Sequence, residues 1–128
     1  MAILERISDL LKREGNMTLV ELIKNGVICF LNAKNRNEAL TQLVTSLSKE
    51  KKIFDRDLFY DAILKREKIV STGIGMGIAI PHAKLEGYDD FFIAVGVQKS
   101  LEGVEWDALD GDSVRLIFMI GGPTDRQT

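Results

Sequence analysis

The apolar residues of the N-terminal half recur at intervals of three and four, the spacing of one helix face. This pattern predicts a helix over 3–14 and a short helix over 19–23. Two longer helices are expected after Asn35 and Asp55, because both residues cap helix N-termini well. Glu38 supports the helix start at Asn35, because it lies three residues after Asn35, the spacing of a capping box. The predicted inner faces are Ala39, Leu40, Leu43, Val44 and Leu47 in one helix, and Leu58, Phe59, Ala62 and Ile63 in the other.

The second half of the chain has the pattern of strands. The helix after Asp55 is expected to end near 65–67, and a glycine-rich, β-branched stretch follows over 69–80. Asp110-Gly111 predicts a tight turn before the last strand. Helices followed by strands indicate one α/β (α+β) domain in which helices pack against a mixed sheet. The runs that predict strands are 27–31, 91–97 and 114–120.

Composition narrows the function classes. The chain has 128 residues, 45% apolar and 28% charged, which suits a single globular domain. A net charge of -2 argues against a nucleic-acid partner. No apolar stretch reaches the length that spans a bilayer and the N-terminus lacks signal-peptide features, so we expect a cytoplasmic protein. With one histidine and one cysteine, Cys29, no His/Cys metal cluster and no intrachain disulfide can form. No metal or cofactor is predicted.

The only histidine lies in the stretch "GIGMGIAIPHAK", over 73–84. The glycines match neither a P-loop nor a dinucleotide fingerprint, because no Gly-Lys-Ser/Thr follows and Pro81 stands where the helix should run. Pro81 cannot donate to a strand ladder, so His82 is expected just past a strand end. Small neighbours leave room for a bulky group, and a lone imidazole can itself be the nucleophile toward a phosphoryl group. A structural histidine is the alternative.

The string "STGIGMGIAIPHA" over 71–83 closely resembles the phosphorylation-site signature of enzyme IIA proteins of the bacterial phosphoenolpyruvate-dependent phosphotransferase system, in the mannitol/fructose/nitrogen-regulatory class. The resemblance extends to 59–67 and 106–111. We therefore interpret 17–128 as an EIIA type-2 domain and 1–16 as an N-terminal helical extension. The implied fold is a mixed sheet sandwiched by helices.

The resemblance implies roles for individual residues. His82 would accept a phosphoryl group from the histidine-containing phosphocarrier protein and pass it on. Arg66 would neutralise the phosphoryl oxygens during transfer; the alternative for Arg66 is a helix C-terminal residue that meets the helix dipole. The residues expected to wall the phosphoryl pocket are Thr72, Gly73, Gly75 and Gly77.

The resemblance leaves three functions to consider. A nitrogen-type regulatory IIA protein, which would act on a regulated target protein, is favoured. A fructose- or mannitol-type sugar-transport IIA component that donates to a IIB domain is the alternative, and a non-phosphorylated interaction module is the third. Family members continue past the segment 123–125 into helices with a second active-site histidine, and no histidine follows His82. The domain is thus expected to be C-terminally incomplete, with an exposed sheet face that favours homo-oligomers.

Overall fold

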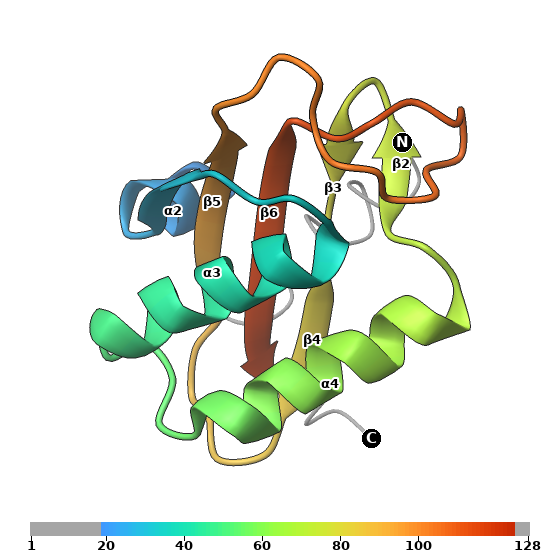
Figure 1. The fold of residues 1–128 in the computed structure, drawn as a ribbon. Coiled ribbons are helices and arrows are strands. Elements are labelled where there is room, and N and C mark those ends of the chain that lie inside the picture. The colour runs from blue at the N-terminus through green and yellow to red at the C-terminus, as the bar shows by residue number, and fades with distance from the viewer. Residues whose placement is uncertain (1–18, 125–128) are drawn as a thin grey trace.

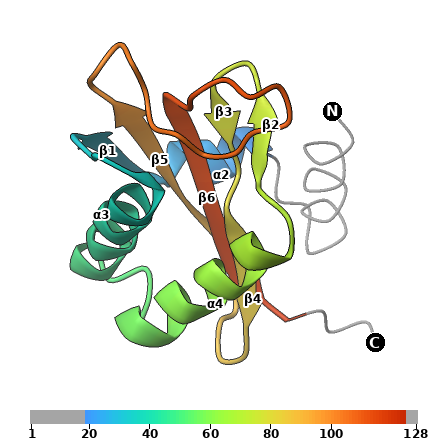
Figure 2. The same ribbon diagram turned by 45° about the vertical axis from the view of Figure 1, so that its right-hand side comes forward.

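The computed structural model describes residues 19–124. Six strands form one mixed sheet in the order β1-β5-β6-β3-β2, and β4 also pairs with β6. Helices α3 and α4 lie together on one face of this sheet and α2 lies on the other (Figures 1 and 2). The predicted mixed sheet packed by helices is therefore confirmed. The elements are α2 (Leu19–Lys24), β1 (Val27–Leu31), α3 (Arg36–Lys49), α4 (Arg56–Ile69), β2 (Gly73–Gly75), β3 (Ile78–Ala79), β4 (His82–Leu85), β5 (Phe92–Gln98) and β6 (Leu116–Pro123).

The two long helices begin where the sequence predicts. The Asn35 side chain accepts a hydrogen bond from the Glu38 amide at 2.9 Å, and Glu38 in turn accepts one from the Lys34 amide at 3.0 Å. Asp55 caps α4 in the same way, by accepting from the Leu58 amide at 3.1 Å. Each cap satisfies an amide that the helix itself leaves unpaired. The predicted helix over 3–14, within the 1–16 extension, lies outside the described residues.

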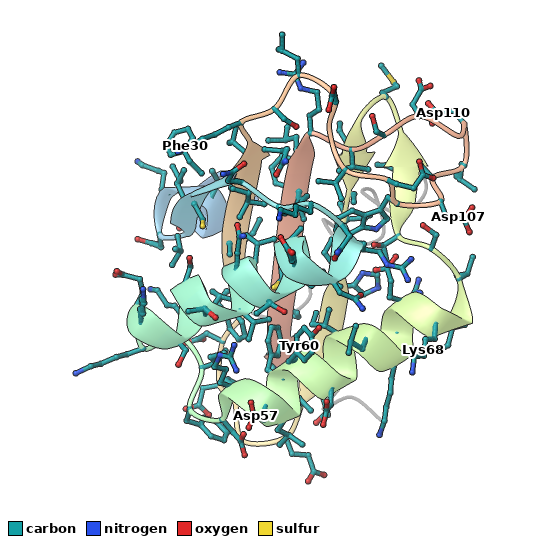
Figure 3. All side chains as sticks on the ribbon, viewed as in Figure 1. Phe30, Asp57, Tyr60, Lys68, Asp107 and Asp110 are labelled. Atoms are coloured by element: carbon teal, nitrogen blue, oxygen red, sulfur yellow. The ribbon has the colours of Figure 1, made fainter. Side chains whose placement is uncertain are left out.

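The predicted inner face of α4 is partly wrong. Its buried residues are Phe59, Ile63 and Glu67, one per turn. Leu58 is 49% exposed, and the helix runs on to Ile69, past its predicted end. The sequence pattern gave the wrong inner face because an acidic residue, Glu67, occupies the third inner position. An apolar residue there would have completed the apolar face of the helix. Figure 3 shows Tyr60 of the same helix in the space between α4 and α3.

Strands β3 and β4 follow one another along the same side of β6, both parallel to it. Ile78 and Ala79 pair with its beginning, and the four residues of β4 pair with its end. The two residues between β3 and β4, Ile80 and Pro81, interrupt the strand. The sequence predicts the break but not β4. The last strand was predicted over 114–120, and β6 runs instead from Leu116 to Pro123.

The glycine-rich stretch folds into a hairpin between β2 and β3. Met76 and Gly77 link the strands with φ angles of 58° and 78°, the left-handed values of a two-residue hairpin turn. Asp110 steadies this turn, since its carboxylate accepts from the Met76 amide at 2.9 Å. Gly73 allows a close approach instead: a Cβ there would lie 2.8 Å from the Cβ of Ala108. Asp107 and Asp110 lie on the loop that passes over β2 (Figure 3).

The main core lies between α3, α4 and the sheet. Leu43 of α3 is fully buried and packs over Gly96 of β5, where a Cβ would come within 3.0 Å of its side chain. The opposite sheet face is also apolar. It carries a smaller cluster of buried residues, but Ile28 and Phe30 of the edge strand β1 are 63% and 66% exposed.

Removing buried side-chain volume from the main core should destabilise the domain. We expect Leu43→Ala to lower the free energy of unfolding by about 2–5 kcal/mol, because a cavity adds to the lost burial. Leu101→Ala is the matched control, since Leu101 is 81% exposed, and it should stay within about 0.5 kcal/mol of the parent. Denaturant titration of both variants measures the difference. Equal losses would contradict the assignment of Leu43 to the core.

Candidate active site

His82 is the first residue of β4. It comes directly after Ile80 and Pro81, which interrupt the strand that runs alongside β6. The Pro81 carbonyl accepts a hydrogen bond from the Ile120 amide at 2.9 Å, and His82 itself is in register with Ile120. The next three residues of β4 continue the pairing. The backbone on both sides of the histidine is therefore held by β6, and the imidazole starts from a fixed position.

The imidazole is oriented by its own backbone. Its Nδ1 atom lies 2.8 Å from the carbonyl oxygen of Ile80. A carbonyl oxygen can only accept, so Nδ1 carries the proton in this contact. In the neutral ring, the lone pair that can attack an electrophile is then on Nε2.

Burial lowers the pKa of His82 below its ordinary value of 6.5. The hydrogen bond to Ile80 raises the pKa again, and the charge of Glu67 acts in the same direction. The positive charges of Arg66 and Lys84 oppose protonation and lower it. With burial as the largest influence, the pKa is lowered overall, which favours the neutral ring that a nucleophile needs.

Arg66 reaches the same region from the last turn of α4. Its guanidinium donates to the Val70 carbonyl at 2.9 Å, just past the end of the helix. This contact fits the role of a helix C-terminal cation. Arg66 also lines the hollow beside His82, so the contact at the helix end leaves the predicted role beside the imidazole open. The helix end holds the guanidinium near the imidazole.

A shallow hollow of about 390 Å³ lies between α4 and β4. Its basic residues are Lys65 and Arg66 from the helix and Lys84 from the strand, so positive charge is concentrated here although the chain as a whole carries -2. Ile69, 78% exposed, gives the rim an apolar part. Such a surface can hold an anionic group beside a neutral imidazole. The hollow is lined by Ala62, Lys65, Arg66, Ile69, His82, Ala83 and Lys84.

The other predicted pocket residues do not line this hollow. Thr72 is 1% exposed, and its hydroxyl donates to Glu67 at 2.7 Å. Gly73 faces the loop that carries Ala108, while Gly77 belongs to the hairpin turn. Gly75 lies against the side chain of Asp110. The structure brings His82 and Arg66 to one hollow and places the glycines at the β2–β3 hairpin and against the loop that carries Ala108 and Asp110.

Residues 19–124 contain no group of three His, Cys, Asp or Glu side chains that could hold a metal ion. Their helices are also too short or too polar to cross a membrane.

Comparison with known proteins identifies the family. Residues 21–128 match the model of the phosphoenolpyruvate-dependent sugar phosphotransferase system EIIA 2 family. The fructose-specific EIIABC component of Bacillus subtilis (strain 168) is 41% identical over 105 residues, which are 81% of this chain and 16% of that protein. The nitrogen regulatory protein of Klebsiella oxytoca is 39% identical over 97 residues, or 75% of this chain and 58% of that protein.

Solved structures agree with this assignment. The nitrogen regulatory protein IIA-Ntr of Neisseria meningitidis matches with a TM-score of 0.70 and 26% identity, over 79% of this chain and 67% of that one. The mannitol IIA enzyme of Escherichia coli, in its complex with phosphorylated IIB, matches with a TM-score of 0.59 and 26% identity, over 77% and 69% of the two chains. The chain belongs to the EIIA type-2 family of the phosphotransferase system.

Three residues near the imidazole were missed by sequence reasoning. Lys65 and Lys84 were assigned no role, and only the packing of α4 on β4 brings them to one hollow. The predicted helix end near 65–67 gave Glu67 no role of its own, but this residue is only 4% exposed. The available signal was its spacing of four and eight residues from Ile63 and Phe59, on the inner face of the helix.

The state of the imidazole can be measured directly. Because the chain has one histidine, its ring signals in a ¹H–¹⁵N spectrum need no assignment. We expect half-protonation below pH 6.5, since burial disfavours the charged ring, and protonation of Nδ1 rather than Nε2 above that pH. A titration midpoint above 6.5, or an Nε2–H tautomer, would contradict the geometry described here.

Proposed function

We propose that this domain is a histidine phosphocarrier in which His82 accepts a phosphoryl group from the histidine-containing phosphocarrier protein and passes it to an acceptor. The observation that supports this most is the imidazole itself. It is oriented with Nε2 free, its pKa is lowered, and it lines a basic hollow. Family membership supports the donor, since the domain belongs to a phosphoenolpyruvate-dependent system.

The transfer step needs only the groups already described. The Nε2 lone pair of His82 attacks phosphorus while the bond between phosphorus and the donor's ring nitrogen breaks. The electron pair of that bond returns to the donor ring, which leaves as a neutral imidazole. Nδ1 keeps its proton throughout, because the Ile80 carbonyl accepts it. The reverse arrangement, with His82 as the leaving ring, passes the group on.

The basic side chains act on the charge of the transferred group. Three phosphoryl oxygens share negative charge in the transition state, and fixed cations beside them lower its energy. Arg66 suits this role best, because its position is held by the Val70 carbonyl and its fork can bind two oxygens. Lys65 and Lys84 add positive charge at the rim of the hollow.

The surface around the hollow suits a protein donor. Leu58 and Ile69 lie on the outer side of α4 and are 49% and 78% exposed, and Val70 beyond the helix end is 54% exposed. A docked protein would cover these apolar side chains together with the basic residues. Such a contact brings two imidazoles into line and excludes water from the reacting group.

For the acceptor we infer a regulated target protein, in a nitrogen-type role, with a IIB domain as the second candidate. The fold match to IIA-Ntr and the identity to the Klebsiella nitrogen regulatory protein support the first. The likeness to the fructose-specific component and to the mannitol enzyme bound to IIB supports the second. Incubation of the phosphorylated domain with a purified IIB domain separates them, since only a sugar-transport IIA component should lose its phosphoryl group rapidly.

Phosphorylation itself can be tested by mass. We expect the protein, incubated with phosphoenolpyruvate, enzyme I and the histidine-containing phosphocarrier protein, to gain the mass of one acid-labile phosphoryl group. His82→Ala should gain none, because it removes the only imidazole. If neither protein gains mass while a known IIA protein does under the same conditions, the domain is an interaction module and the proposal fails.

Arg66 should contribute to the rate rather than to the capacity for phosphorylation. We expect Arg66→Ala to slow phosphoryl acceptance by roughly a hundredfold, the usual cost of removing one fixed charge from such a site. Lys68→Ala is the matched control, because Lys68 is an exposed cation of the same helix turn that does not line the hollow. Single-turnover kinetics with the phosphorylated donor measure both. Equal rates in the two variants would remove Arg66 from the site.

A further inference from the structure

The most unusual group next to the site is a buried acid. Glu67 occupies the third inner position of α4, after Phe59 and Ile63, and is 4% exposed. A carboxylate loses its hydration when it is buried, so this position is costly unless protein groups replace the water. An apolar residue would fill the same place without that cost. The presence of an acid calls for a reason beyond packing.

The partners of Glu67 are all hydrogen-bond donors. Its Oε2 accepts from the Thr72 amide at 2.7 Å and from the Trp106 indole at 3.0 Å. Its Oε1 accepts from the Thr72 hydroxyl at 2.7 Å. Within residues 19–124 no Lys or Arg side chain makes an ion pair with it. The carboxylate therefore ties the last turn of α4 to the start of β2 and to the loop that carries Trp106.

The same connections continue to the imidazole. The Thr72 carbonyl accepts a hydrogen bond from the Ile80 amide at 3.0 Å. On the other side of that residue, the Ile80 carbonyl accepts from Nδ1 of His82 at 2.8 Å. Thr72 and Ile80 thus form a continuous hydrogen-bonded path from the buried carboxylate to the ring. Each step is a short contact between fixed backbone or buried side-chain groups.

We propose that Glu67 is a positioning residue for phosphoryl transfer, which holds the Ile80 carbonyl through Thr72 and so keeps the His82 ring in its Nδ1–H form. This inference rests on the proposed function for its kinetic part only. The other part, the orientation of the His82 ring, concerns the unphosphorylated protein and does not depend on that function. Glu67 does not line the hollow, so it acts through other residues.

Glu67 also contributes charge. It follows Arg66 directly on α4, and the two act on the pKa of His82 in opposite directions. The other cations near the ring are Lys84 on β4 and Lys65 on α4. Strand β6, which pairs with β4, carries no charged residue in Leu116–Pro123. The negative charge of Glu67 is thus set against an otherwise basic surrounding and raises the pKa of the imidazole.

Two variants separate the geometry from the charge. In Glu67→Gln the amide oxygen can accept from the Thr72 amide and the indole, and the amide nitrogen can donate to the Thr72 hydroxyl. We expect this variant to keep the Nδ1–H tautomer but to lower the pKa of His82. In Glu67→Met all three hydrogen bonds are lost at similar volume. We expect ring signals that report mixed tautomers and phosphoryl acceptance at least about tenfold slower, as a small misplacement of a reacting group costs rate.

Two controls exclude trivial explanations. Asp61→Asn removes one negative charge from an exposed position of the same helix, and should leave the tautomer, the pKa of His82 and the rate unchanged. Leu43→Ala loosens the core without touching the path to the ring, and should also leave the tautomer and the rate unchanged. If Leu43→Ala and Glu67→Met slow the reaction equally, the effect is general destabilisation and the proposal is overturned.

The decisive measurement is the ¹H–¹⁵N spectrum of the single histidine, recorded beside single-turnover kinetics. A Glu67→Met protein with the parent tautomer and the parent rate would overturn the proposal. If the parent accepts no phosphoryl group, the proposed function falls, and the spectra still decide whether Glu67 positions the ring.

A second pair of variants applies if Glu67→Met does not fold. Thr72→Val removes the hydroxyl, which donates to Glu67 and accepts from the Trp106 indole at 3.4 Å, at nearly constant volume, while Thr72→Ser retains it. We expect mixed tautomers in the valine variant and the parent form in the serine variant. Identical ring spectra in the two would overturn the proposal.

Discussion

The arrangement of the site depends on one missing hydrogen-bond donor. Pro81 has no N–H, so the strand along β6 cannot continue its ladder through this residue, and β3 ends at Ala79. The Pro81 carbonyl still accepts from the Ile120 amide, which keeps the chain on the sheet. The carbonyl of Ile80 is left to meet the imidazole of His82.

The helix α4 joins this strand break to the rest of the domain. Phe59 and Ile63 place the helix on the sheet through apolar burial. Its last turn then brings opposite charges to the imidazole, Arg66 at the hollow and Glu67 beneath it. The guanidinium is held by the helix end, and the carboxylate by Thr72 and Trp106. One packed helix thus fixes both residues relative to the strand that carries the histidine.

The sequence predicted the parts of this arrangement that depend on local chemistry. The caps at Asn35 and Asp55 and the apolar face of α3 were correct because neighbouring residues determine them. The parts that depend on distant neighbours were not predictable. Strand β4 contains a lysine and is short, so only its pairing with β6 identifies it. Glu67 lies at the predicted end of its helix, and only the fold brings Trp106, which is distant in the sequence, close enough to donate to it.

The site residues divide in the same way. His82 and Arg66 were identified through a motif, and the fold brings both to one hollow. Lys65 and Lys84 join them only because α4 packs on β4. The glycines of the motif serve the hairpin and the close approach of the Ala108 loop, a role that a spacing pattern does not distinguish from a ligand pocket.

On the proposed function, the domain must release the phosphoryl group that it accepts. A shallow, open hollow suits this need. A deep cage of fixed donors would stabilise the phosphorylated histidine itself and would not favour the transition state. Here Lys65 and Lys84 are solvent-exposed, so water and salt weaken their attraction for a bound phosphoryl group. A docked protein that covers Leu58 and Ile69 would remove that water, and the same charges would act more strongly while it stays. The transition state would then be stabilised most strongly while the two proteins are in contact. This holds both when the phosphoryl group is accepted and when it is passed on.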